Sequence, residues 1–267
     1  CCFGSYMEVC ILFKPKRIMK KLLMYLAFAL ICMAVAPILQ SCDDENSQYP
    51  LGNYIIAMAT VAKETGTVYP YFVLDNGKTV WVAASAVEYE GLEPGQRVIG
   101  NFTILDDNRD GFDYFARVNN YTLVLTKDVI NLTEANEDSI GNSKTTISDM
   151  WIGADYLNVE FLMVYPSYEK HMVNLVNNRI IPVDDDGYAH LEFRYNNMGD
   201  SNGKLIPGIV SFELGEYGPS NKTLKGLKVK INSIKYGDKV YTYNYSDEKS
   251  TEESRNFSSG VNSEGLK

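Results

Sequence analysis

The chain has 267 residues, a formal net charge of −9 and five cysteines, and all five cysteines lie within the first 42 residues. The 225 residues that follow contain none, which excludes a disulfide-stapled scaffold and a thiolate-based metal site from that region. An apolar content of 45% with 12% aromatic residues is typical of folded proteins and excludes disorder throughout the chain.

An uncharged apolar segment near the start has the pattern of a secretory signal peptide. Two lysines precede fifteen uncharged residues, 22–36, and a proline then ends the helix that this run favours. The run is shorter than the about 20 residues that a membrane-spanning helix needs. We therefore interpret residues 19–41 as a signal peptide. Residues 1–18 lie upstream of a better start at Met19, so we interpret them as an over-extended gene start.

The signal segment ends in a tetrapeptide that is similar to a bacterial lipobox, Leu39-Gln40-Ser41-Cys42. In a lipobox an aliphatic residue stands three positions before the cysteine and a small residue directly before it. The thiol sulfur accepts a diacylglycerol, and acylation then adds a further chain such as palmitate. The pattern predicts cleavage between Ser41 and Cys42 and lipidation of Cys42. A plain signal peptide with an incidental cysteine is the alternative.

Cleavage at this position would leave a strongly acidic chain. Residues 1–41 carry five basic residues and one acidic residue, so the 226 residues from Cys42 onward have a net charge of −13. Such a surface repels nucleic acid and anionic lipid, and a nucleic-acid partner is therefore not expected. We expect attachment to a membrane through the N-terminal acyl chains.

The first part of the remaining chain predicts a small β-barrel. Asn76-Gly77 stands between two β-rich runs and indicates a hairpin, because both residues tolerate positive φ. A short helix is expected at 86–92. Five strands in this order are typical of an OB-type barrel, which we assign to residues 51–130. The expected strands span 54–63, 69–74, 79–84, 97–105 and 112–125.

The second part predicts a separate β-sandwich. Residues 131–147 are polar and lack apolar periodicity, so we interpret them as a linker. Six segments with strand character follow in residues 148–245, and their spacing favours a β-sandwich. Residues 246–267 are rich in Ser, Glu and Asn and are predicted to be a disordered tail. The expected fold class is all-β, a five-stranded OB-like barrel followed by a β-sandwich.

Three strand-like motifs follow the lipobox and the predicted barrel. They are Asp149–Gly153 with Tyr156–Phe161, then Leu191–Asn197, then Val210–Leu214. With these motifs the chain resembles the NigD-like lipoproteins of Bacteroidota, over nearly all of its length after Cys42. The resemblance implies an N-terminal OB-like domain, a C-terminal β-sandwich and an immunity-like role, with no catalytic residues assigned. At the position where this family often carries an Arg-His-Asn run, this chain has Arg194-Tyr195-Asn196. Because Tyr195 replaces the histidine, this chain lacks any role that the family's histidine has.

Two further short motifs are similar to signals of secreted Bacteroidota proteins. Asp43, Asp44 and Glu45 follow the lipobox cysteine and resemble a surface-export signal; they equally fit an acidic tether over residues 42–50. Asp138-Ser139-Ile140 fits the short pattern of an O-glycosylation site, with Ser139 as the acceptor.

Candidate catalytic and metal-binding residues are few. Asp106, Asn108 and Asp110 with Gly111 match the first half of a calcium loop, but position 12 is Arg117 instead of the glutamate that such a loop needs. A hairpin turn is the favoured interpretation, and calcium the weaker one. Only two histidines exist, His171 and His190, and His190 is expected to point outward from its strand. No nucleophile, zinc-binding or nucleotide-binding motif occurs after Cys42. We therefore expect no cofactor and no enzymatic activity, although a hydrolase stays an alternative class.

A ligand site cannot be assigned from these patterns, but a class of ligand can be favoured. Residues 50–130 carry six basic and ten acidic side chains, which disfavours a polyanion. Four barrel aromatics could bind a sugar or a peptide, or could simply pack across strands: Tyr69, Tyr71, Trp81 and Tyr114. We predict a lipid-anchored, non-enzymatic protein of the outer membrane. It binds a protein or peptide ligand and acts as an immunity-like protein. It is exposed at the cell surface if the export signal acts. An accessory glycan-binding surface lipoprotein is the alternative.

Overall fold

A computed structural model describes residues 53–165, 167, 169–183, 185–200, 202–246 and 255–267, all within the compact unit Leu51–Lys267. The predicted gene start, signal peptide and acidic tether lie outside the described residues. The same holds for the predicted cleavage, lipidation and export residues Ser41, Cys42, Asp43, Asp44 and Glu45. No helix in the described part of the chain is long and apolar enough to span a membrane.

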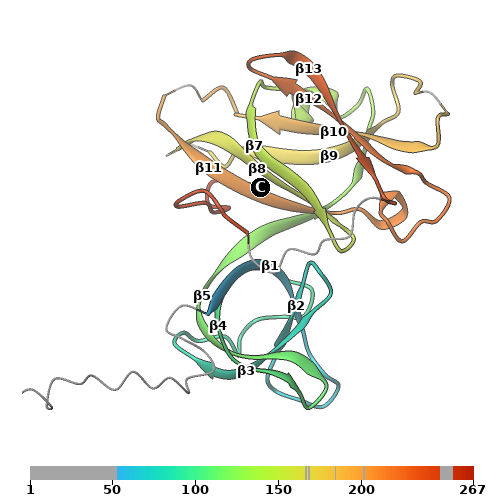
Figure 1. Cartoon of the computed structure of the whole chain (residues 1–267). Helices are drawn as coiled ribbons and strands as arrows, with labels where there is room; N and C mark the ends of the chain where they lie inside the picture. Colours follow the sequence, from blue (N-terminus) through green and yellow to red (C-terminus); the bar gives the residue numbers. More distant parts are fainter. Residues whose placement is uncertain (1–52, 166, 168, 184, 201, 247–254) are drawn as a thin grey trace, which may run out of the picture. The chain divides into compact units, whose positions relative to one another are not determined.

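Five strands form a closed barrel (Figure 1). Neighbouring strands pair antiparallel as β1–β2, β2–β3, β1–β4 and β4–β5, and a parallel β3–β5 pairing closes the ring. Side chains alternate, so that Phe72, Val80, Phe102 and Ala116 are fully buried inside. The strands are β1 (Tyr54–Ala62), β2 (Tyr71–Leu74), β3 (Thr79–Ser85), β4 (Arg97–Arg109) and β5 (Phe112–Asp128).

The predicted hairpin between β2 and β3 is present, with Gly77 at φ 85°. The predicted short helix at 86–92 is wrong. This segment is a loop in which Tyr89 and Leu92 are buried, and the Tyr121 hydroxyl donates to the Glu88 carbonyl over 3.0 Å. Burial of two apolar side chains and this external hydrogen bond stabilise a turn there in place of a helix.

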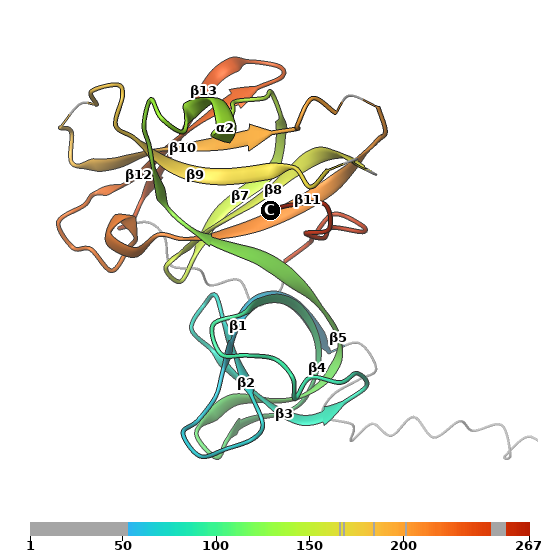
Figure 2. The ribbon, with the colours of Figure 1, turned by 180° about the vertical axis from the view of Figure 1, so that it is seen from behind.

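The second domain is a sandwich of two sheets (Figure 2). One layer continues the barrel sheet, in the order β3-β2-β1-β4-β5-β11-β8-β7, and the other has the order β13-β12-β10-β9-β6. The strands are β6 (Ile130–Leu132), β7 (Thr146–Gly153), β8 (Tyr156–Tyr165), β9 (Met172–Asn178), β10 (Tyr188–Asn196), β11 (Lys204–Glu213), β12 (Gly226–Ser233) and β13 (Gly237–Asn244). Two short helices, α2 (Glu137–Ile140) and η2 (Gly215–Tyr217), complete the elements.

Strand β5 belongs to both domains, and this corrects the predicted boundary at residue 130. Residues 112–124 pair with β4, and residues 114–118 also pair with β3, in the barrel. Residues 125–128 pair parallel with β11 in the sandwich. A strand of 17 residues is therefore the connection between the domains.

The predicted linker 131–147 is also wrong, because most of this segment is part of the sandwich. Strand β6 pairs parallel with β9, and Leu132 and Ile140 pack with Val176 in a small buried cluster. The many polar residues of the segment face solvent. The sparse spacing of its two buried apolar residues has no strand or helix period, and this is why the sequence pattern did not reveal them.

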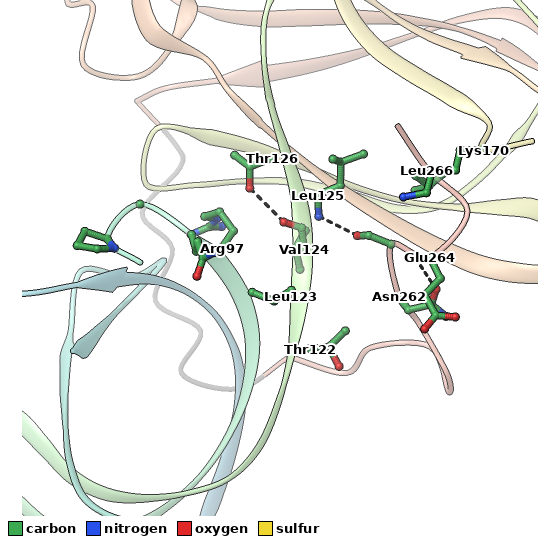
Figure 3. Close-up of a pocket in the computed structure, with 14 residues that line it drawn as sticks. Arg97, Thr122, Leu123, Val124, Leu125, Thr126, Lys170, Asn262, Glu264 and Leu266 are labelled. Carbon is green, nitrogen blue, oxygen red and sulfur yellow. Dashed lines mark hydrogen bonds between the residues drawn. The ribbon is translucent and has the colours of Figure 1, made fainter. Parts of the chain in front are cut away.

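The C-terminal segment 255–267 is folded against the sandwich, so the prediction of a disordered tail 246–267 is wrong for these residues; residues 247–254 lie outside the described part. Leu266 is 3% exposed and forms a bridge with His171, while Asn262 forms one with Gly208 of β11. The Leu125 amide donates to the Ser263 hydroxyl over 2.9 Å (Figure 3). The same hydroxyl donates to the Ile209 carbonyl over 2.7 Å.

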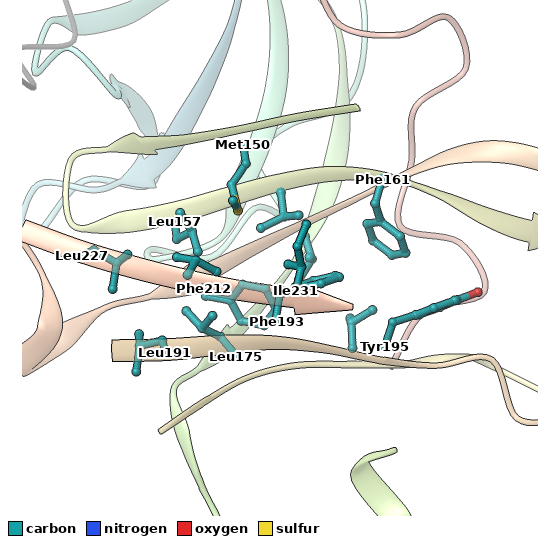
Figure 4. Close-up of a cluster of buried hydrophobic side chains, with 14 of the residues drawn as sticks. Met150, Leu157, Phe161, Leu175, Leu191, Phe193, Tyr195, Phe212, Leu227 and Ile231 are labelled. Atoms are coloured by element: carbon teal, nitrogen blue, oxygen red, sulfur yellow. The ribbon is translucent and has the colours of Figure 1, made fainter. Parts of the chain in front are cut away.

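The main core lies between the two sheets of the sandwich (Figure 4). Phe161 of β8 packs edge-on against Phe193 and Tyr195 of β10, with ring centroids 5.3 and 5.4 Å apart. Phe212 of β11 packs against Phe193 at 6.1 Å. Alternation of apolar residues along β8, β10 and β12 places one side of each strand in this layer, as the sequence pattern predicts.

Candidate functional site

Four aromatic side chains gather on the outer surface of the barrel and are partly exposed: Tyr71, Trp81, Phe112 and Phe115. We call this set the aromatic face. Tyr71 and Trp81 occupy the strand positions that alternate with the buried Phe72 and Val80, so they point away from the barrel interior. The parallel register of β3 with β5 sets Trp81 beside Phe115.

The rings of the aromatic face meet edge-on or tilted. Phe112 is central, with its ring centroid 5.2 Å from Tyr71 and 5.1 Å from Trp81, at interplanar angles of 75° and 50°. Phe115 lies 6.4 Å from Phe112 and 6.5 Å from Trp81. These are favourable aromatic geometries, and they leave an uneven apolar surface instead of a single plane.

A cation lies at one side of this face. The Arg109 guanidinium stands 5.0 Å from the Phe115 ring centroid, and its Nε is 3.4 Å from an Asp110 carboxylate oxygen. Arg109 is more than half exposed, at 59% of its side chain. A guanidinium beside aromatic rings adds a charged, hydrogen-bonding group to an otherwise apolar patch.

The predicted calcium loop forms the tip of the β4–β5 hairpin beside the aromatic face. Asn108, Asp110 and Gly111 take positive φ values of 52°, 50° and 87°, as a tight turn requires. Arg109 also lies 4.0 Å from Asp106, so one guanidinium faces two of the candidate carboxylates. Among the described residues no group of three or more His, Cys, Asp or Glu side chains is arranged to hold a metal ion. The hairpin-turn interpretation therefore matches the geometry of this loop.

The other two predicted aromatics lie apart from the aromatic face. Tyr114 is 9% exposed, and its hydroxyl is 2.6 Å from the Lys78 ammonium. Tyr69 precedes β2 and is 53% exposed. Sequence reasoning thus found two of the four face residues and missed Phe112, Phe115 and the adjacent Arg109. The missing signal was the β3–β5 register, which only barrel closure establishes.

The two histidines differ in environment. His171 is fully buried, and its Nδ1 lies 2.6 Å from the Tyr195 hydroxyl while its Nε2 is 3.8 Å from an Asp200 oxygen. Burial raises the pKa of Tyr195 to about 12, so this hydroxyl stays protonated and forms a hydrogen bond with Nδ1. Burial also lowers the pKa of His171 below its ordinary value, against the opposing charge of Asp200. A neutral imidazole enclosed in this way joins β9 to β10 and has no access to substrate.

Tyr195, the middle residue of Arg194-Tyr195-Asn196, has its side chain in the main core (Figure 4). His190, in contrast, lies on the outer side of β10, as predicted, but its side chain is 21% exposed and 3.0 Å from Asp186. The Lys228 ammonium, and then His190, hold the pKa of Asp186 well below its usual range. These groups form an ion-pair network on the outer sheet.

Ser139, the predicted O-glycosylation residue, is exposed on the one-turn helix α2. Its hydroxyl donates to the Asn136 carbonyl over 2.9 Å, and its own carbonyl accepts from the Asn196 side chain over 3.0 Å. The side chain is accessible, and glycosylation of Ser139 stays a prediction.

Two family models match the chain. The NigD-like N-terminal OB domain covers residues 58–124, and the NigD-like C-terminal beta sandwich domain covers residues 128–245. Together they confirm the predicted OB barrel and sandwich, and the second match begins at the end of β5. No curated protein matches the sequence.

Solved structures with the same fold come from related bacteria. A protein of unknown function from Bacteroides vulgatus is 47% identical, with a TM-score of 0.72, over 77% of this chain and 96% of that one. A protein described as toxin-related, from Parabacteroides distasonis, is 31% identical, with a TM-score of 0.59, over 72% and 94%. A NigD-like immunity protein from Bacteroides caccae is 12% identical, with a TM-score of 0.51, over 72% and 96%, and shows the fold alone. From the two family models and the 47% identical structure, the chain belongs to the NigD-like family.

Proposed function

We propose that this protein is a lipid-anchored envelope protein, without catalytic activity, that binds a protein ligand or an exposed peptide segment through the aromatic face. The observation that carries the proposal is the cluster of Tyr71, Trp81, Phe112 and Phe115 on the outside of the barrel, with Arg109 beside it. Large apolar patches on soluble domains commonly mark interaction sites.

The composition of the patch favours a protein ligand. Trp, Tyr and Arg are the residues that dominate the binding energy of protein interfaces. The tilted rings leave gaps that aliphatic or aromatic side chains of a partner can fill, whereas one flat ring plane would suit the face of a sugar. Rings that already pack on one another also lose little conformational entropy on binding.

The lipobox supports attachment to the outer membrane through Cys42, and the acidic residues after it support export to the cell surface. With a net charge of −13 after cleavage, the protein has no electrostatic attraction to an anionic membrane, and the acyl chains are its anchor. An anchored binding protein can intercept a ligand before it reaches the membrane, and this is the immunity-like role if that ligand is a bacteriocin.

A glycan is the second candidate ligand. OB barrels bind oligosaccharides on the surface of strands 2 and 3, and Tyr71 and Trp81 lie on those two strands here. The exposed Tyr69 lies just before the same strand and could extend such a site.

A pull-down from intact outer membranes tests the proposal. The full-length protein is compared with Trp81→Ala/Phe112→Ala, and Tyr236→Ala serves as the control, because Tyr236 is a 61% exposed aromatic of the sandwich. We expect the double variant to lose a co-purified protein that the control retains. The same variants on a glycan array test the second candidate. If the double variant captures the same proteins and glycans as the wild type, the aromatic face is not the binding site.

A further inference from the structure

We infer that the protein has a second binding site, where an extended peptide segment of a partner adds as a strand to the open side of β5. This site is distinct from the aromatic face and goes beyond the proposed function. It lies where β5 leaves the barrel and enters the sandwich, next to the C-terminal segment (Figure 3).

The inference begins with a break in the hydrogen-bond ladder. On one side β5 pairs with β4 from Phe112 to Val124, with two register shifts. On the other side the pairing with β3 ends at Val118, and the pairing with β11 begins at Leu125. Residues 119–124 therefore have no strand partner on that side among the described residues.

The direction of the unpaired groups follows from the alternation of an antiparallel ladder. The Leu125 amide points to the open side, because it donates to the Ser263 hydroxyl over 2.9 Å. Two and four residues earlier, the N–H and C=O groups of Leu123 and Tyr121 point the same way. Before them the register shifts at a bulge around Asn119, and the Val118 carbonyl is taken by the Ala86 amide. The open stretch thus presents two donors and two acceptors at strand spacing.

A pocket of about 820 Å³ lies along the end of this stretch, at Thr122–Val124, and continues to Thr126. Leu123 is 50% exposed at its floor, and the exposed Lys170 and Glu264 stand on its rim. An exposed strand edge with an apolar side chain is an aggregation hazard that soluble proteins avoid unless a partner uses it. The pocket is lined by Pro94–Arg97, Thr122–Thr126, Lys170, Asn262–Glu264 and Leu266.

The chemistry of the site favours a peptide. Alternating amide donors and carbonyl acceptors match an extended backbone, and the exposed Leu123 offers contact to one apolar side chain of it. Six residues of strand span about 20 Å, at about 3.3 Å per residue. The rim carries one charge of each sign, so charge does not select a polyanion or a polycation.

Leu123→Pro is the most direct test, because it removes one amide donor from the open side. The Leu123 N–H points away from β4, so a proline there leaves the β4–β5 ladder intact, as at natural strand edges. Leu123→Ala is the matched control, since it shortens the same side chain and keeps the amide. The probe is a phage-displayed library of random dodecapeptides selected on the full chain, followed by fluorescence polarisation with the enriched synthetic peptides.

We expect enriched peptides to bind Leu123→Pro at least tenfold more weakly than wild type, and Leu123→Ala less than about threefold more weakly. If circular dichroism shows that Leu123→Pro does not fold, the test uses the wild-type protein with versions of the same peptides that each carry one backbone N-methyl group. Loss of binding at every second peptide position is then the expected result for strand addition. Trp81→Ala should bind these peptides normally, which separates this site from the aromatic face.

Four results would overturn the inference. The first is that no peptide is enriched, and the second is that wild type and Leu123→Pro, or all N-methylated peptides, bind equally well. The third is that binding of the enriched peptides depends on Trp81 instead of Leu123. The fourth is that the wild type is a dimer in sedimentation equilibrium and Leu123→Pro abolishes the dimer. The last result would assign the edge to self-association.

Discussion

At the scale of single residues, the buried Arg97 links the two domains. Arg97 is 1% exposed and donates to both Asp75 oxygens, over 2.6 and 3.0 Å, and to the Asn158 side chain over 3.1 Å. Its guanidinium stacks 4.3 Å from the Tyr156 ring. Gly153 permits this arrangement, because a Cβ there would lie 1.9 Å from Asp75 Oδ2. The barrel strand β4 and the sandwich strand β8 therefore share one polar cluster.

Arg97→Met should destabilise the protein by about 3–5 kcal/mol, because the change leaves Asp75 as an uncompensated buried charge and removes a donor to Asn158. Urea unfolding followed by tryptophan fluorescence measures the loss. Arg109→Met is the control, since the ion pairs of Arg109 are exposed and should contribute little. Equal midpoints for wild type and Arg97→Met would contradict a stabilising role.

His171 makes stability depend on pH. Burial holds its folded-state pKa below the ordinary 6.5, so the unfolded chain takes up a proton first as the pH falls. Neutral His171 therefore makes its full contribution to the free energy of unfolding above about pH 6.5, and this contribution is lost progressively at lower pH. His171→Asn keeps an acceptor for Tyr195 and should flatten the dependence between pH 7 and 5, by up to about 1.4 kcal/mol per pH unit. If His171→Asn keeps the wild-type slope between pH 7 and 5, His171 is not responsible.

At the scale of elements, the C-terminal segment is a structural part of the sandwich. Arg255 pairs with Asp149 at 2.6 Å and lies 4.2 Å from the Trp151 ring, and Phe257 packs on the same ring at 6.0 Å. Leu266, next to the last residue of the segment, is buried in the main core. Residues 255–267 therefore cover apolar surface that the strands alone leave open.

Leu266→Ala should cost about 2–4 kcal/mol of unfolding free energy, through lost burial and a residual cavity. Leu205→Ala is the control, because Leu205 is 61% exposed. Thermal unfolding and limited proteolysis near the C-terminus measure the effect. Equal melting temperatures for the two variants would show that the segment adds no stability.

The strands were predictable from sequence because alternation and turn chemistry are local. The five barrel strands lie close to the expected ranges, and the six strand segments expected within residues 148–245 correspond to the seven strands β7 to β13. The linker and the tail were not predictable, because Leu132, Ile140 and Leu266 are single apolar residues among polar ones. The aromatic face was only half predictable, since Phe115 lies beside Trp81 through the β3–β5 pairing and Phe112 packs on Trp81 through the closure of the barrel, and no local pattern encodes either.

At the scale of the whole molecule, a shared strand makes the two domains one structural unit. Strand β5 carries ladder bonds in both, and the Arg97 cluster adds polar contacts at the same junction. The two proposed ligand sites, on the barrel and along β5, therefore lie on strands that are continuous between the domains. We propose that the N-terminal segment connects this unit to the envelope.

Cys42→Ala tests that connection. Two or three acyl chains on one sulfur and its amino group give a stable anchor, whereas a chain with a net charge of −13 has no basic patch to replace them. We expect Cys42→Ala to move from the membrane fraction to the soluble fraction and to lose incorporation of labelled palmitate. Cys32→Ala, inside the apolar run of the signal segment, should stay in the membrane with its label. Recovery of Cys42→Ala in the membrane at the wild-type level would end the lipoprotein assignment, because no other group in the chain predicts attachment.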